Sequence, residues 1–239
     1  MLRKTHIQAF WNPNLFYGGF TIAILLYQLI NTYHYNKINL LLFMVTEMDF
    51  DEDFKVLNNA IISFLKRESI RDTLQHILKR PNKDWEKWLQ VELEYHLEKY
   101  CRCTAKREVP ALPDHRYRTG KVGMYVDLII RKKNFEDEHY MYVELKCDDT
   151  VDSLYNKMIV DAKKLQSIRQ SFLEKSNKKM RSYWCIGFFQ NTNLIHTKEM
   201  RNYLNEIYST KTACKIVNIC TCFVADDSCK CDDIGYVIF

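Results

Sequence analysis

The spacing of apolar side chains predicts helical structure at the start of the main part of the chain. Apolar residues recur at three- and four-residue intervals over residues 50–78, and Pro81 then ends the pattern. A second helix is predicted from Asp84, which is suited to an N-cap, to Tyr100. Both segments are amphipathic, so each should cover one face of a larger structure.

Runs rich in β-branched and aromatic residues follow, with polar residues between them. They predict strands over residues 101–112, 122–132, 139–147, 183–189, 215–224 and 234–239. Further helices are predicted over residues 151–173 and 198–208. The order αβββαβ, with additions, predicts an α/β (α+β) fold in which helices flank a mixed central sheet.

The first 47 residues differ from the rest. No Lys, Arg, Asp or Glu occurs between Thr5 and Asn36, and residues 11–35 are borderline in length and apolarity for a membrane helix. They could form a membrane anchor, a buried helix, or an upstream extension if Met48 is the natural start. We favour an extension over an anchor. This predicts a hydrophobic extension at 1–47, a domain at 48–239 and a cytoplasmic protein, with membrane anchoring as the alternative.

The net charge of +5 is only a mild basic excess, but the basic residues are unevenly placed. They are concentrated between Lys157 and Arg181, where they could contact a phosphate backbone or form a solvated helix surface. Neither interpretation is favoured by the sequence. The candidate nucleic-acid-binding residues are Lys157, Lys163, Lys164, Arg116 and Arg118.

Three charged residues stand inside two apolar strands. If the polar loop 134–138 closes a hairpin centred near residues 135–136, Asp127 lies opposite Glu144 or Leu145. Glu144 and Lys146 are two apart and share one face of their strand. Charges in such surroundings are costly unless they are paired or bind a metal. We therefore predict a Mg²⁺ site in preference to a cross-strand salt bridge.

One acidic residue of the second helix lies within its apolar face. At 100° per residue, Glu92 falls beside Trp85, Trp88 and His96. A glutamate in a buried stripe needs a partner, and a metal ion or Lys146 would serve. The alternative is a glutamate at the edge of the core whose carboxylate reaches solvent.

The order of helical Glu92, Val-Asp127-Leu-Ile-Ile and Val-Glu144-Leu-Lys146 resembles the PD-(D/E)XK nuclease superfamily, with the restriction-endonuclease-like fold, over residues 84–190. The resemblance implies that Asp127, Glu144 and Glu92 hold Mg²⁺, which Mn²⁺ can replace, and that Lys146 assists the attacking water. It implies cleavage of nucleic acid, DNA rather than RNA, in defence, restriction or repair. Many members act as homodimers.

Val126 stands where the family's motif has a nominal proline, a change that leaves the metal ligands untouched. Members often carry a further polar residue in the helix after the lysine, and Lys157, Asp161 and Lys164 are the candidates here. The alternative function is a catalytically inactive nucleic-acid-binding or interaction module on the same fold.

Nine cysteines are present, and four of them form a symmetric pattern near the C-terminus. A hairpin centred on residues 225–226 would align Cys222 with Cys229 and Cys220 with Cys231. Four thiolates there could bind a structural Zn²⁺. Because Cys-x-Cys is a poorer zinc spacing than Cys-x-x-Cys, reduced thiols without a metal are favoured.

Overall fold

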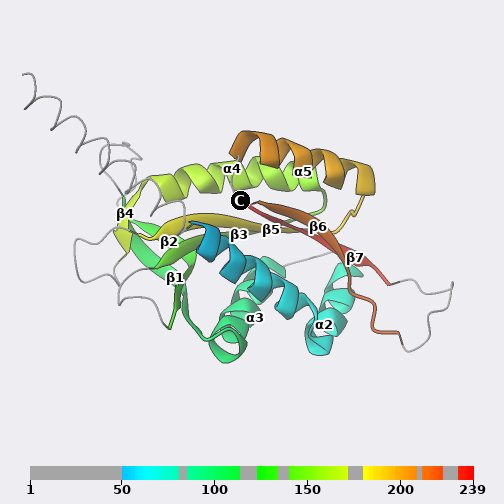
Figure 1. Ribbon diagram of the computed structural model, residues 1–239. Coiled ribbons are helices and arrows are strands. Elements are labelled where there is room, and N and C mark those ends of the chain that lie inside the picture. The colour runs from blue at the N-terminus through cyan, green and yellow to red at the C-terminus, as the bar shows by residue number, and fades with distance from the viewer. Residues whose placement is uncertain are drawn as a thin grey trace, which may run out of the picture. The chain divides into compact units, whose positions relative to one another are not determined.

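The computed structural model describes residues 50–80, 85–113, 123–133, 140–171, 180–208, 212–222 and 231–239. The chain divides into two units between Met48 and Asp49, and all of the described residues belong to the second unit. In this unit one sheet lies between two groups of helices (Figure 1). The segment 1–47 lies outside the described residues, as does the predicted N-cap Asp84.

The described strands form one seven-stranded mixed sheet in the order β4-β1-β2-β3-β5-β7-β6. Neighbouring strands are antiparallel except β3 and β5, which run parallel across a helical connection. The strands are β1 (Cys103–Pro113), β2 (Met124–Lys132), β3 (Met141–Asp148), β4 (Ile168–Ser171), β5 (Ser182–Phe189), β6 (Ala213–Asn218) and β7 (Asp233–Ile238).

Helices cover both faces of the sheet, as Figure 1 shows. The helix over residues 50–65, α2 (Glu68–Leu78) and α3 (Trp85–Tyr100) pack on one face. The other face carries α4 (Val151–Gln166) and α5 (Leu194–Tyr208). The predicted mixed α/β fold, with helices flanking a mixed sheet, is confirmed at this level.

Alternation of side chains along the central strands builds a core on each face. In β2, Leu128 and Ile130 face the helices of the N-terminal half, whereas Ile129 faces the α4 side. Strands β2 and β3 are apolar except at a few positions. Those few positions form the candidate site described below.

Two helical boundaries differ from the expectation. The helical pattern over residues 50–78 is interrupted at Lys66 and Arg67, because the Arg67 backbone is extended (ψ 126°) and begins α2 anew. The helix predicted to run to residue 173 ends at Gln166, where both the backbone N–H and the hydroxyl of Ser167 donate to the Lys164 carbonyl. The chain then forms β4, which was not predicted; it pairs with β1 and becomes the edge strand of the sheet.

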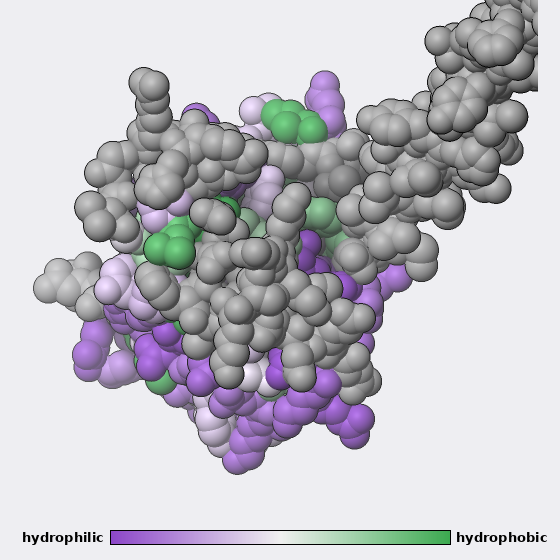
Figure 2. Space-filling view, turned by 90° about the vertical axis from the view of Figure 1, so that its left-hand side faces the viewer, coloured by the Kyte–Doolittle hydropathy of each residue, from purple (hydrophilic) through white to green (hydrophobic). Residues whose placement is uncertain are grey.

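The described surface on one side of the molecule is mainly hydrophilic. Figure 2 views that side, and the hydrophobic residues seen among the coloured atoms occur in a few separate places. In this view the coloured part of the surface therefore offers no broad apolar area.

Candidate active site

The candidate site lies where β2 and β3 separate. Their register pairs Leu128 with Val143, and one further step places Asp127 opposite Glu144, which confirms the predicted hairpin register. Strand pairing ends at Leu128. Beyond it, the Oδ2 atom of Asp127 accepts a hydrogen bond of 2.9 Å from the backbone N–H of Leu145. The Asp127 carboxylate thus takes the place of a backbone hydrogen bond between the two strands.

Glu144 is buried on the α4 side of β3, with only 3% of its surface exposed. Its Oε2 atom accepts a hydrogen bond of 2.6 Å from Lys164 Nζ of α4. Its Oε1 atom is buried and has no hydrogen-bond partner among the described residues. Burial, together with the neighbouring charge of Asp127, raises the pKa of Glu144 to about 8, although Lys164 opposes the shift. Such a carboxylate is costly to ionise unless a cation accompanies it.

Lys146 lies two residues further along the same face of β3. Its Nζ atom is 3.3 Å from Asp161 Oδ2 of α4 and 3.5 Å from Glu86 Oε1 of α3. Burial disfavours the ammonium form, but the charges of Asp161 and Glu86 outweigh it, and the pKa of Lys146 is raised. Lys146 is therefore a protonated cation that two carboxylates hold in place.

Glu86 is a site residue that the sequence analysis missed. It lies in the first turn of α3, and its Oε2 atom accepts a hydrogen bond of 3.2 Å from the backbone N–H of Cys147. Its other oxygen contacts Lys146. The signal that could have found it is an acidic residue at a helix start, where the helix dipole favours negative charge.

The structure does not bring Glu92 into this cluster. Glu92 is half-buried on α3, and it forms no hydrogen bond or ion pair with Asp127, Glu144 or Lys146 in the described structure. Its position two turns into the helix separates it from the end of α3 that meets β3. The first turn of α3, not its middle, supplies the helical glutamate.

Helix α4 supplies further polar groups to the site. Lys157, Asp161 and Lys164 are spaced by four and three residues and therefore share one side of the helix. Asp161 contacts Lys146, Lys164 contacts Glu144, and Lys157 Nζ lies 2.6 Å from Asp148 Oδ2. All three candidates thus form ion pairs with β3.

Beside the cluster, β1 has a distorted backbone. The β1–β2 register places Glu108 opposite Asp127. Glu108 has a φ of 51°, in the left-handed region, and its carboxylate pairs with Lys87 of α3. A non-glycine residue in this conformation costs on the order of 1–3 kcal/mol, and such residues concentrate at functional sites.

The charges of the cluster suit one divalent cation. Four carboxylates and two ammonium groups meet here: Glu86, Asp127, Glu144, Asp161, Lys146 and Lys164. With all six ionised, four negative and two positive charges leave two negative charges. Among the described residues no three of these carboxylates bring oxygens within 4.8 Å of one another. Mg²⁺ needs only one or two protein carboxylates besides water and phosphate, and the unpartnered Glu144 Oε1 atom fits that role.

The candidate nucleic-acid-binding residues are divided by the structure. Lys157 and Lys164 lie in the ion pairs described above, whereas Lys163 is exposed on α4. Arg116 and Arg118 lie outside the described residues. Contact with nucleic acid stays a prediction for all five.

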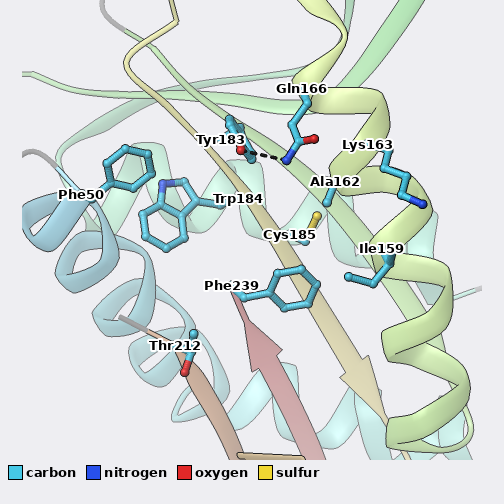
Figure 3. Close-up of a pocket in the computed structure, with 10 residues that line it drawn as sticks. All are labelled: Phe50, Ile159, Ala162, Lys163, Gln166, Tyr183, Trp184, Cys185, Thr212 and Phe239. Atoms are coloured by element: carbon cyan, nitrogen blue, oxygen red, sulfur yellow. Dashed lines mark hydrogen bonds between the residues drawn. The ribbon is translucent and has the colours of Figure 1, made fainter. Parts of the chain in front are cut away.

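An apolar cavity of about 340 Å³ opens beside α4. Figure 3 shows Trp184, Phe239 and Lys163 around it, and a hydrogen bond of 3.0 Å from Gln166 Nε2 to the Tyr183 hydroxyl at its edge. None of the predicted metal ligands lines this cavity. It has no place in the chemistry considered below.

The four cysteines for which zinc binding was the less favoured alternative are partly described. Cys220, Cys222 and Cys231 lie together, with their sulfur atoms within 4.8 Å of one another. Cys229 lies outside the described residues.

Comparison with protein-family models, curated proteins and solved structures finds no match to this chain. Within the described residues, none of the helices combines the length and the apolar character needed to cross a membrane. The segment 11–35 lies outside the residues to which this finding applies.

Proposed function

We propose that this protein is a Mg²⁺-dependent nuclease that hydrolyses phosphodiester bonds of nucleic acid, with DNA favoured over RNA. The observation that carries the proposal is Glu144. Its carboxylate is buried beside Asp127 and Lys146, and its Oε1 atom lacks a hydrogen-bond partner among the described residues. A carboxylate that binds a cation needs an oxygen that no protein donor already occupies, and Oε1 meets that requirement.

The arrangement of the elements supports a restriction-endonuclease-like core. A helix (α3) precedes three antiparallel strands (β1 to β3), and α4 then leads to β5, which is parallel to β3. The charged residues lie on the middle strands of this unit and on its two helices. This order agrees with the αβββαβ order of the PD-(D/E)XK superfamily that the motif resembles.

In this proposal Asp127 and Glu144 hold the metal, and Glu86 takes the place assigned above to Glu92. Bound Mg²⁺ would lower the pKa of water and neutralise charge on the phosphodiester. Mn²⁺ could replace it, since both are hard cations that prefer oxygen ligands. The backbone N–H of Leu145 fixes the Asp127 carboxylate for this role.

Lys146 acts in this proposal as a hydrogen-bond donor to the phosphate or to the attacking water. Its pKa is raised, so it stays protonated at neutral pH and cannot serve as a general base. Asp161 and Glu86 hold its ammonium group at two points. A donor positioned in this way stabilises developing negative charge without reorganising.

A cleavage assay on the full chain tests the proposal. Plasmid, single-stranded DNA and RNA are incubated with Mg²⁺ or Mn²⁺, using wild type, Asp127→Ala and Lys146→Ala. We expect wild type to cut and each variant to lose at least about 100-fold in rate, as for removal of one transition-state donor. The matched control is Lys132→Ala, which removes a lysine of β2 that pairs with Glu52; it should cut like wild type.

One observation favours a second candidate, the inactive nucleic-acid-binding module. Lys164 already donates to Glu144 at 2.6 Å, and a lysine can replace a metal ion in balancing a buried carboxylate. Binding of DNA without cleavage in any metal, by wild type and Asp127→Ala alike, would establish this candidate and exclude the nuclease.

A further inference from the structure

Three cysteines meet beyond the paired parts of β6 and β7. Cys220 and Cys222 follow β6, and Cys231 precedes β7. The register pairs Asn218 with Asp233, and two further steps place Cys220 opposite Cys231. The alignment of Cys220 with Cys231 that the sequence predicts therefore agrees with the register of β6 and β7.

The sulfur atoms have the spacing of a metal site. All three lie within 4.8 Å of one another, and the Sγ atoms of Cys222 and Cys231 are 3.4 Å apart. Thiolates about 2.3 Å from a tetrahedral Zn²⁺ have sulfurs roughly 3.8 Å apart. Shifts of a few tenths of an ångström up to about 1 Å would thus suffice to coordinate the ion.

Nearby hydrogen bonds fix the position of one of these sulfurs. The backbone N–H of Cys222 donates to Cys220 Sγ at 3.4 Å. Asn218 Oδ1 accepts from the backbone N–H of Cys220 at 3.0 Å and holds the turn after β6. Soft thiolates select Zn²⁺ over the hard cations proposed for the carboxylate cluster.

Helix α2 contacts both arms of this cysteine cluster. Arg71 Nη1 donates to the Cys220 carbonyl at 3.2 Å. The buried Gln75 donates to the Asp232 carbonyl at 2.8 Å and accepts from its backbone N–H at 3.1 Å. A cross-link between the arms would therefore also fix the place where α2 docks on the hairpin.

We propose that Cys220, Cys222 and Cys231 bind one structural Zn²⁺ that fastens the end of the β6–β7 hairpin to α2. Three protein thiolates leave one coordination position, which a water molecule can fill. The proposal rests on the three described residues and is independent of the proposed nuclease activity.

The test uses full-length protein purified with reductant and Zn²⁺, then freed of loosely bound metal. We expect one zinc per chain by mass spectrometry of the metal content. We also expect that Co²⁺ in its place gives the intense visible absorption of tetrahedral cobalt–thiolate. Cys222→Ser should weaken zinc affinity by more than about 100-fold, because even changes outside the coordination shell cost 10–100-fold. Cys101→Ser, outside the cluster, should keep the zinc.

Backbone amide hydrogen exchange gives a second readout on wild type, which avoids any folding defect of a variant. Removal of zinc with a strong chelator should speed exchange in β6 and β7 and leave β2 and β3 unchanged. Asp127→Ala should still hold one zinc, so a failed nuclease proposal would leave this one intact. Reduced wild-type protein without stoichiometric zinc, or with an iron–sulfur cluster or a Cys222–Cys231 disulfide instead, would overturn it.

Discussion

Replacing Glu144 with glutamine should stabilise the metal-free protein while abolishing its metal response. Glu144 is 3% exposed, and its pKa is raised from 4.5 to about 8 by burial and by Asp127. The pH of 7 lies 2.5 units above the unfolded-state pKa of 4.5, and each unit is worth about 1.4 kcal/mol. The folded state therefore pays up to about 3 kcal/mol for this carboxyl group at pH 7, and glutamine removes most of that cost.

The dependence of folding stability on pH gives the sign of the Glu144 contribution independently. The folded-state pKa of Glu144 is above its unfolded value, so the folded state binds more protons between about pH 4.5 and pH 8. Stability from this group is therefore lost as pH rises through that window, by up to about 1.4 kcal/mol per pH unit. Glu144→Gln should lack this contribution. The lost ion pair matters less, because Lys164 is 27% exposed and its ammonium group can reach water.

Urea unfolding of the full chain from pH 5 to pH 8, with and without Mg²⁺, measures both effects. Mg²⁺ at 100 times its Kd should stabilise wild type by about 2.7 kcal/mol and leave Glu144→Gln unchanged. The control is Glu94→Gln, which removes an ion pair of 2.6 Å with Arg107; it should cost about 0.2–1 kcal/mol and keep the Mg²⁺ response. If Glu144→Gln is less stable than wild type and both respond equally to Mg²⁺, Glu144 is a structural ion-pair partner and not a metal ligand.

Three further predictions test other parts of the structure. Glu86→Gln should lower the cleavage rate by at least about 10-fold in a plasmid assay while Glu92→Gln does not, and equal effects would contradict the placement of Glu86. Burial lowers the pKa of His96 from 6.5 to about 4, so stability should fall as pH drops from 6.5 towards 4, by up to about 3 kcal/mol. In an acid-unfolding experiment, His96→Phe should remove this fall in stability. An unchanged fall would show that His96 does not cause it. Gly235→Ala should cost at least about 1–3 kcal/mol in thermal unfolding, because a Cβ there would lie 2.0 Å from the Phe189 ring; an unchanged melting temperature would contradict the packing.

The central site could be predicted from the sequence because it depends on local periodicity. Glu144 and Lys146 share a face through the two-residue repeat of a strand, and the symmetric loop places Asp127 opposite them. The same argument gave the register of the cysteine hairpin, which β6 and β7 confirm over residues 213–218 and 233–238. Each register is a property of a single hairpin and can be predicted without knowledge of the remaining fold.

Features that depend on distant partners could not be predicted in this way. Glu86 belongs to the site because the first turn of α3 meets β3, which helical periodicity alone does not reveal. Helical periodicity puts Glu92 beside apolar residues, yet the docking of α3 leaves it outside the cluster. Similarly, β4 forms because its backbone pairs with the edge of β1, far away in the sequence.

Titration of the full-length protein with Mn²⁺, followed by calorimetry, is the most direct test of the proposed metal site. We expect one binding event in wild type that is lost in Asp127→Asn and retained in Glu94→Gln, whose carboxylate lies in the separate ion pair with Arg107. The cysteine cluster should not contribute, because Mn²⁺ prefers oxygen ligands over thiolates. Identical isotherms for wild type and Asp127→Asn would show that the carboxylate cluster does not hold the metal.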